Sequence, residues 1–270
     1  MKRETPDARA PIGIFDSGVG GLCVLSEIKH MLPGESVIYF ADSANCPYGS
    51  RTEDEAFDLA DKNISFLVDS GCKAIVIACN TVTAVAIGRL RSEYDIPFIG
   101  MEPALKPAVR QTKTGRIGVL ATENTFRGKH FKTTCEKYAA GVEVFVQPGY
   151  GLVELVEQGK QDSDQARALL ADYLVPMMEK GVDTIVLGCT HYPFLKNIIE
   201  QVTDNKAVII DPANAVAAQT GRILDQFAIK SPHGADPFFH FYTTGKTDIL
   251  EKLLSRETGV YPCKIEHITL

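Results

Sequence analysis

The sequence predicts an α/β protein in which two similar parallel-sheet domains are related by a pseudo-two-fold axis, because one pattern occurs twice. GCKAIVIACNT at 71–81 returns as GVDTIVLGCTH at 181–191. Each segment starts with glycine, continues through an apolar run and ends in a small residue, a cysteine and polar residues. Such a run is typical of a strand in a parallel sheet that helices cover on both faces. PIGIFDS at 11–17 and RIGVLAT at 116–122 form a second matching pair.

Strand-like and helix-like segments alternate along the chain, which predicts βαβ units and mostly parallel sheets. The segments 53–70 and 164–180 have helical spacing and acidic first turns, and each ends just before a glycine, a common helix stop. The strand-like runs lie at 12–15, 36–41, 74–78, 117–121, 142–146, 184–187 and 207–210.

The C-terminal part of the chain has no counterpart in the repeat. From residue 207 onward it includes AVIIDPANAVA and PFFHFYTTG, which supply at least two more strands with helices. We expect this part to return to the first domain, which then comprises 1–98 and 208–270, while the second comprises 99–207. No Gly/Ser-rich linker marks a boundary, which predicts two closely packed domains.

The composition is that of a globular protein and argues against several classes of function. The chain has 270 residues and a net charge of −6 with scattered basic residues, which argues against nucleic acid as a partner. The longest apolar runs, about six residues, fall far below the roughly 20 that span a bilayer, and the first ten residues carry no secretory signal. Seven cysteines, an odd number, fit a reducing compartment. We therefore expect a cytoplasmic protein with no membrane partner.

The candidate chemistry lies at the carboxyl ends of the strands, where open parallel sheets bind ligands. Cys79 and Cys189 stand at matching strand ends, so their thiols would face one cleft between the domains from opposite sides. Two opposed acid/base groups suit inversion at a carbon with an acidic C–H bond, since a thiolate removes the proton on one face and a thiol returns one to the other. Cysteine suits this work because its unperturbed pKa is about 8.5. The expected ligand is a small amino acid.

Polar residues beside these strand ends are candidates for assisting the thiols and for holding the ligand. Asp16 could orient Cys79 or accept from it, while His191 and Glu154 could do so for Cys189. A further set offers hydrogen bonds to carboxylate and ammonium groups. This substrate-binding set comprises Asp16, Ser17, Tyr48, Gly49, Asn80, Thr81, Thr190 and His191.

Other motifs do not support a metal or nucleotide site. Cys189 and His191 lack the four-ligand spacing of a zinc site, so we expect no metal and no cofactor. DSGVGG at 16–21 fails the dinucleotide fingerprint, because Cys23 stands at the third glycine, and TTGKT at 243–247 lacks the first glycine of a P-loop. The cysteines outside the repeat are expected to pack as small apolar residues. They are Cys23, Cys46, Cys72, Cys135 and Cys263.

Six segments resemble the cofactor-independent aspartate/glutamate racemase family, and its glutamate racemases in particular. They are IGIFDSGVGG, YFADSANCPYG, ACNT, GVLAT, LGCTHYP and TTG, in family order from residue 12 to about 245. The resemblance implies interconversion of L- and D-glutamate without cofactor or metal, which supplies D-glutamate for peptidoglycan. It also implies that Cys79 and Cys189 are the acid/base thiols, assisted by Asp16, Glu154 and His191, and that the substrate-binding set contacts glutamate.

Several alternatives stay open at the level of the sequence. A family threonine corresponds to Thr122 or Thr125, because ATENT aligns either way. The same thiol pair could act on aspartate or another amino acid, since the pocket decides the substrate. A redox or metal-binding module built on Cys79 and Cys189 is a rival from another class. A two-lobed periplasmic-type binding protein is disfavoured by the missing signal sequence. A homodimer is compatible with the sequence, which does not fix the oligomeric state.

Overall fold

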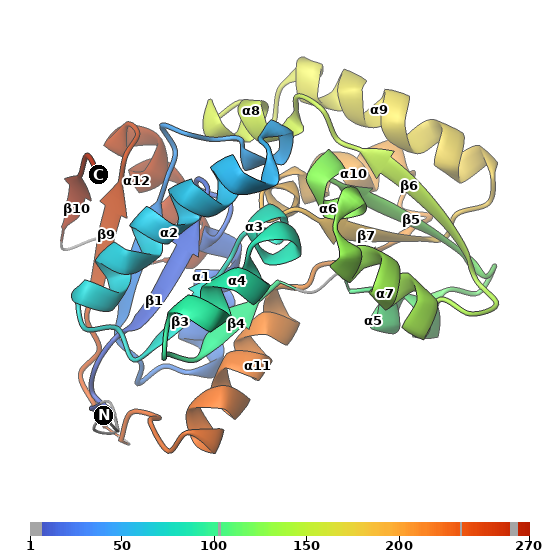
Figure 1. Cartoon of the computed structure of the whole chain (residues 1–270). Coiled ribbons are helices and arrows are strands. Elements are labelled where there is room, and N and C mark those ends of the chain that lie inside the picture. The colour runs from blue at the N-terminus through green and yellow to red at the C-terminus, as the bar shows by residue number, and fades with distance from the viewer. Residues whose placement is uncertain (1–6, 102–103, 233, 260–263) are drawn as a thin grey trace.

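The computed structural model describes residues 7–101, 104–232, 234–259 and 264–270. Figure 1 shows two α/β domains side by side: a first domain built from the blue and cyan N-terminal part with the red C-terminal elements, and a green to yellow second domain. The strands are β1 (Ile12–Asp16), β2 (Val37–Ala41), β3 (Ala74–Ile77), β4 (Phe98–Gly100), β5 (Arg116–Ala121), β6 (Glu143–Pro148), β7 (Thr184–Gly188), β8 (Val208–Ile210), β9 (Phe239–Thr243) and β10 (Ile265–His267).

Both sheets are parallel and share one strand order. The first sheet runs β10-β9-β2-β1-β3-β4 and the second runs β6-β5-β7-β8, with every paired strand parallel to its neighbour. The order in the second sheet repeats β2-β1-β3-β4 strand for strand. The two-domain fold predicted from the sequence repeat is therefore confirmed. The C-terminal part adds β9 and β10 to the edge of the first sheet, as predicted.

The glycines that open the two repeated segments have the same backbone conformation. Gly71 and Gly181 have φ angles of +80° and +81°, in the left-handed region that glycine adopts without strain. Each follows a long helix, α2 (Glu53–Asp69) or α9 (Asp164–Glu179). The left-handed residue ends the helix and turns the chain directly into the next strand, β3 or β7. The pattern therefore repeats the helix stop as well as the strand.

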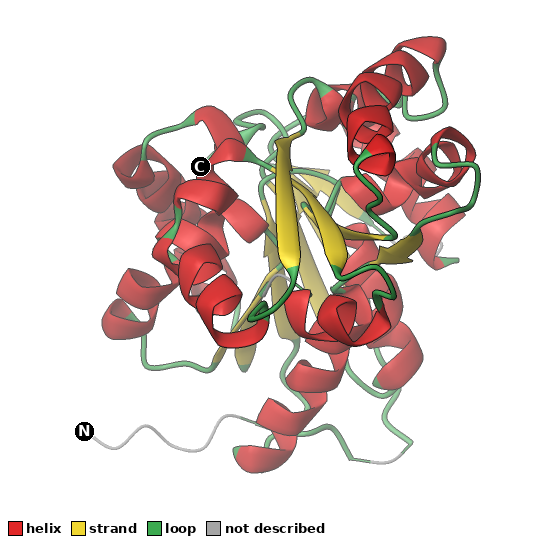
Figure 2. Cartoon of the chain, turned by 90° about the vertical axis from the view of Figure 1, so that its right-hand side faces the viewer, coloured by secondary structure: helices red, strands yellow, loops and turns green. Residues whose placement is uncertain are grey.

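Helices cover the sheets on both faces (Figure 2). Side-chain caps start the two long helices, because Thr52 and Ser163 accept hydrogen bonds from the first-turn N–H groups of Glu55 and Ala166. Within the described ranges, no helix is both long and apolar enough to cross a membrane. The other helices are α1 (Leu22–Met31), α3 (Asn80–Val85), α4 (Ile87–Glu93), α5 (Leu105–Gln111), α6 (Glu123–Arg127), α7 (Lys129–Tyr138), α8 (Leu152–Glu157), α10 (Lys196–Val202), α11 (Ala213–Gln226) and α12 (Thr247–Thr258), with short 3₁₀ turns η1 (Tyr48–Ser50) and η2 (Tyr192–Leu195).

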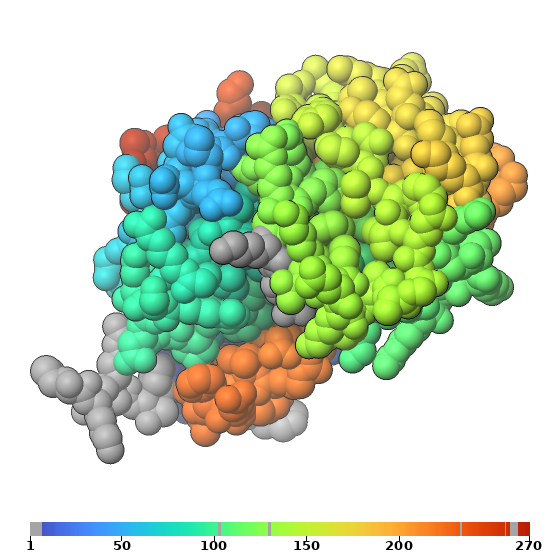
Figure 3. Space-filling view, turned by 45° about the vertical axis from the view of Figure 1, so that its right-hand side comes forward, coloured from blue at the N-terminus to red at the C-terminus, as the bar shows by residue number. Residues whose placement is uncertain are grey.

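The two domains pack directly against one another. Strands β1, β2, β3 and β7 are buried along their whole length, which explains their continuous apolar sequences. One buried apolar cluster contains Val19 and Leu22 of the first domain together with Leu152 and Tyr192 of the second. Figure 3 shows the second domain, in green and yellow, seated directly on the cyan part of the first. The interface therefore holds the strand ends of the two domains close together.

The crossings between the sheets lie two or three residues later than the sequence predicted. Strand β4 at 98–100 pairs with β3 in the first sheet, and β8 at 208–210 pairs with β7 in the second. Residues 99–100 therefore belong with the first sheet, and residues 208–210 with the second. Strand β4 was not predicted, because its three residues are too short for a periodic pattern.

Candidate active site

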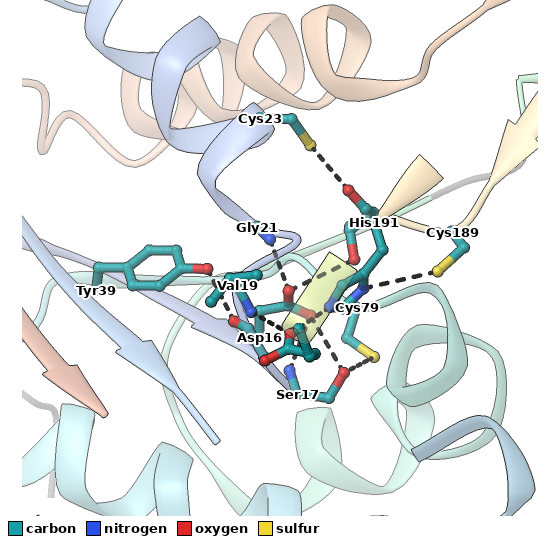
Figure 4. A network of polar contacts seen from close by, with 12 residues as sticks. Asp16, Ser17, Val19, Gly21, Cys23, Tyr39, Cys79, Cys189 and His191 are labelled. Carbon is teal, nitrogen blue, oxygen red and sulfur yellow. Dashed lines mark hydrogen bonds and ion pairs between the residues drawn. The ribbon is translucent and has the colours of Figure 1, made fainter. Parts of the chain in front are cut away.

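The two repeated cysteines lie at equivalent positions, each just beyond the carboxyl end of a central strand. Cys79 lies between β3 and α3, and Cys189 between β7 and η2. Both are buried, with exposed fractions of 4% and 6%. They are close enough for charge on Cys189 to influence the pKa of Cys79. Figure 4 shows both thiols within one polar network to which both domains contribute.

On the first-domain side, Cys79 lies beside a hydroxyl group and a carboxyl group. The Oγ atom of Ser17 is 3.3 Å from the Sγ atom of Cys79. Asp16, at the end of β1, accepts hydrogen bonds from the N–H groups of Ser17 at 2.8 Å and Gly21 at 2.6 Å. These bonds hold the turn that places Ser17 against the thiol. The glycine-rich segment is therefore the loop that holds Ser17 beside Cys79. It does not act as a nucleotide-binding fingerprint.

Burial dominates the electrostatics on this side. It raises the pKa of Asp16 to about 7, against the lowering effects of His191 and the two N–H groups. Burial also raises the pKa of Cys79 to about 12; the Asp16 carboxylate adds to this rise, and the hydrogen bond from Ser17 opposes it. Cys79 is therefore a neutral thiol at neutral pH in this structure.

On the second-domain side, the partner of Cys189 is a charged pair. The Nδ1 atom of His191 is 3.8 Å from the Sγ atom of Cys189, and its Nε2 atom is 2.6 Å from Oε1 of Glu157. Glu157 also accepts the N–H of Val19 at 2.7 Å, across the domain interface. Burial lowers the pKa of His191, but hydrogen bonds with Cys189, Cys46 and Glu157 raise it well above 6.5. His191 is therefore an imidazolium at neutral pH, held by the Glu157 carboxylate.

The glycines of the loop allow this close approach between the domains. A Cβ atom on Gly20 would lie 2.6 Å from Oγ1 of Thr190 and 2.7 Å from Nδ1 of His191. A Cβ atom on Gly18 would lie 2.0 Å from Oε1 of Glu157. All three distances are shorter than Cβ atoms show in real structures, so the absence of a side chain lets the loop lie against the Cys189 side.

Glu154 was predicted to assist Cys189, but a different glutamate of the same helix contacts His191. Glu154 is exposed and lies with Gly49 and Thr122 along a cavity of about 120 Å³ between the domains. Glu157, one helical turn later at the end of α8, contacts His191 instead. The segment LVELVE carries the same apolar pair before each glutamate, so the sequence alone does not separate the two.

Most of the predicted substrate contacts gather at the strand ends. Ser17, Asn80, Thr81 and Thr190 are buried beside the thiols. Neither the oxygen nor the nitrogen of the Asn80 side-chain amide has a hydrogen-bond partner within the described part of the chain. An unpaired buried amide is costly, which indicates that a polar ligand completes its bonds.

The turn at Tyr48 and Gly49 is anchored in the first domain and lies against the second. The Tyr48 hydroxyl donates to Asp42, inside the first domain, so this side chain anchors the turn. A Cβ atom on Gly49 would lie 2.8 Å from Cβ of Thr122, which places the turn against the second domain. Of the two threonines left open by the sequence, Thr122 reaches across the interface, with its Oγ1 atom 3.0 Å from that of Thr81.

One further residue near the thiols was not predicted from the sequence. Cys46, expected to be a small core residue, is half-buried, and its Sγ atom lies within 4.8 Å of a ring nitrogen of His191. Cys23 also has a polar contact, since its thiol donates to the carbonyl oxygen of Thr190 at 3.6 Å. Both contacts cross between segments far apart in the sequence, so no local pattern marks them.

Known proteins resemble this chain in both sequence and fold. A family described as Asp/Glu/Hydantoin racemase matches residues 23–220. A glutamate racemase of Herpetosiphon aurantiacus is 45% identical over 87% of this chain and 92% of its own length. The crystal structure of glutamate racemase isoform RacE1 from Bacillus anthracis has a TM-score of 0.87 at 32% identity, covering 97% of this chain and 98% of that one. A glutamate racemase from Francisella tularensis, in complex with D-glutamate, has a TM-score of 0.83 at 28% identity, covering 97% of this chain and 98% of that one.

The family match extends through both domains and includes Cys79 and Cys189 at the two repeated strand ends. The predicted resemblance is therefore confirmed, and the chain belongs to the Asp/Glu/hydantoin racemase family.

Proposed function

We propose that this protein interconverts L- and D-glutamate with two cysteine thiols and no cofactor. The observation that carries the proposal is the placement of Cys79 and Cys189, two buried thiols at equivalent strand ends of facing domains. The glutamate racemase names of close relatives and the D-glutamate bound to a similar structure support glutamate as the substrate.

Cys79 would act on one face of the substrate. Its pKa, which burial raises to about 12, is too high for a base at neutral pH. An amino-acid substrate brings a positively charged ammonium group into the cleft, and this charge favours the thiolate. The Ser17 hydroxyl, 3.3 Å from Sγ, can donate to the thiolate as it forms. Substrate binding and activation of Cys79 are therefore coupled.

Cys189 would act on the opposite face with a different partner. The imidazolium of His191 lies 3.8 Å from Sγ through Nδ1 and can stabilise negative charge on the sulfur. Glu157 holds the other ring nitrogen at 2.6 Å, which fixes the orientation of the ring. One thiolate then removes the α-proton while the other thiol delivers a proton from the opposite side, and the roles reverse for the other enantiomer.

Recognition of the substrate would depend on polar groups around the thiols. The unpaired amide of Asn80 can donate to a carboxylate and accept from an ammonium group. Hydroxyls of Thr81, Thr190 and Ser17, with the backbone at Gly49, complete the predicted contacts. In a bacterial cell the D-glutamate formed would serve peptidoglycan synthesis, as the resemblance implies. The cytoplasm stays the predicted location.

Circular dichroism of the purified protein with single enantiomers tests this function. After dialysis against a chelator, the signal of L-glutamate and that of D-glutamate should both decay to zero, and the protein should have no visible absorbance band. L-Aspartate serves as the competing substrate. Decay with aspartate but not with glutamate would assign the protein to another substrate of the family. Activity that returns only with zinc or pyridoxal phosphate would contradict the two-thiol mechanism.

A further inference from the structure

Three metal-ligating side chains meet at the interface between the domains. The Sγ atom of Cys46, a carboxylate oxygen of Glu157 and a ring nitrogen of His191 all lie within 4.8 Å of one another. Among the described residues, these three side chains form the one group of cysteine, histidine and acidic residues that could hold a metal ion. It shares His191 and Glu157 with the site described above but adds a thiol, Cys46, to which the racemisation mechanism gives no role.

The donors come from both domains. Cys46 lies in the first domain, between β2 and η1, whereas Glu157 ends α8 and His191 follows β7 in the second. A single ion bound to all three would therefore link the domains directly. It would also fix the residue next to the turn at Pro47 and Tyr48, which leads into the predicted substrate contacts.

The donor set favours one class of metal. A thiolate with an imidazole and a carboxylate suits zinc and similar thiophilic divalent ions, whereas magnesium and calcium prefer oxygen ligands alone. Three protein ligands leave a fourth position open, as in many zinc sites. The Glu157 carboxylate is already oriented by the N–H of Val19 at 2.7 Å. Such supporting hydrogen bonds are typical of metal ligands.

We propose that Cys46, Glu157 and His191 form an inhibitory site for zinc or a similar thiophilic divalent cation. The ion takes the place of the hydrogen bond between His191 and Glu157, so it fixes the imidazole ring beside Cys189 in a metal-bound orientation that the Glu157 hydrogen bond no longer sets. It also holds the domains together while Cys46 stays ligated. The binding site stands on the geometry alone; its inhibitory effect rests on the proposed racemase function.

Metal binding is measured first in the Cys79→Ser/Cys189→Ser variant, in which the catalytic thiols cannot compete for the ion. Titration with Co²⁺, a coloured substitute for zinc, should show binding of one ion with thiolate-to-cobalt charge-transfer absorption. Adding Cys46→Ser should abolish that absorption. Adding Cys23→Ser instead should leave the absorption unchanged. This control removes another half-buried thiol, the one that contacts Thr190. Glu157→Gln should weaken Co²⁺ binding without removing the thiolate band at saturating metal.

Inhibition is then measured with zinc on the otherwise unmodified enzyme, relative to the metal-free rate of each variant. The zinc concentration for half inhibition should rise at least about tenfold in Cys46→Ser and stay unchanged in Cys23→Ser. An absent charge-transfer band in the variant that retains Cys46 would overturn the proposed site, as would a band that survives Cys46→Ser. Equal zinc sensitivity with and without Cys46 would place inhibition elsewhere. If the protein lacks racemase activity, the cobalt spectra still decide the binding site.

Discussion

Cys79 and Cys189 occupy equivalent ends of repeated strands, yet their partners differ in charge. Cys79 lies beside the neutral hydroxyl of Ser17 and a buried carboxyl group, and burial raises its pKa to about 12. Cys189 lies beside the imidazolium of His191, which the Glu157 carboxylate holds. The repeated fold therefore sets where the thiols lie, whereas the loops around each strand end set the charge beside each thiol.

The largest expected effect comes from removing either thiol. Because each thiol serves one face of the substrate, Cys79→Ser and Cys189→Ser should each lower kcat by several orders of magnitude, as when one member of a catalytic unit is lost. Serine is nearly isosteric, so far-UV circular dichroism should stay that of the parent protein. A folded variant with near-normal racemisation would show that the thiol in question is not an acid/base group, and the equivalence of the two strand ends would lose its functional meaning.

The Cys79 side should make stability depend on pH through Asp16. Its pKa is raised from 3.8 to about 7, so between these values the native carboxyl keeps a proton that the unfolded chain has released. The free energy of unfolding should therefore fall as pH rises through this window, by up to about 4 kcal/mol. Asp16→Asn cannot titrate and should flatten this slope. Urea denaturation at a series of pH values measures both proteins, and equal slopes would contradict the raised pKa.

The Cys189 side should depend on Glu157 and not on Glu154. Glu157→Gln replaces a charged hydrogen bond to His191 with a neutral one, which should lower kcat about 10- to 100-fold. Glu154→Gln is the matched control in the same helix; since Glu154 is exposed, it should stay within about twofold of the parent rate. Steady-state kinetics of both variants decide the assignment. A larger loss in Glu154→Gln would restore the assignment made from the sequence.

The smallest expected effect concerns the contact between the two sides. Gly20→Ala places a Cβ atom against Thr190 and His191, at 2.6 and 2.7 Å, and should destabilise the protein by about 1–3 kcal/mol while lowering activity. Gly88→Ala is the control, because a Cβ atom there meets nothing within 4 Å and alanine favours the helix α4. Thermal unfolding compares the two. Equal stability of both variants would mean that the loop is free to move away from the Cys189 side.

The fold and the thiol pair could be predicted from the sequence because both follow from local patterns. An apolar run between a glycine and a cysteine, written twice, predicts two buried strands with equivalent ends. Gly71 and Gly181 confirm this prediction, since both end a helix in the left-handed conformation.

The remaining parts of the site depend on contacts that no local pattern records. Glu157 and Glu154 have the same apolar neighbours, and only the orientation of α8 relative to β7 decides which one meets His191. Cys46 meets His191 because two domains pack together, although 145 residues separate them along the chain. Sequence spacing therefore located the central thiols but not all the groups that control their charge.

The fate of the α-hydrogen in D₂O shows whether the two cysteines act on opposite faces of the substrate. If Cys79 and Cys189 act on opposite faces, the proton delivered to the product comes from a thiol that has exchanged with solvent. Starting from unlabelled L-glutamate at low conversion, proton NMR of the separated enantiomers should show D-glutamate almost fully deuterated at the α-carbon and the remaining L-glutamate largely protiated. Substantial α-protium in the early D-glutamate would mean that one base serves both faces, which contradicts opposed roles for the two cysteines.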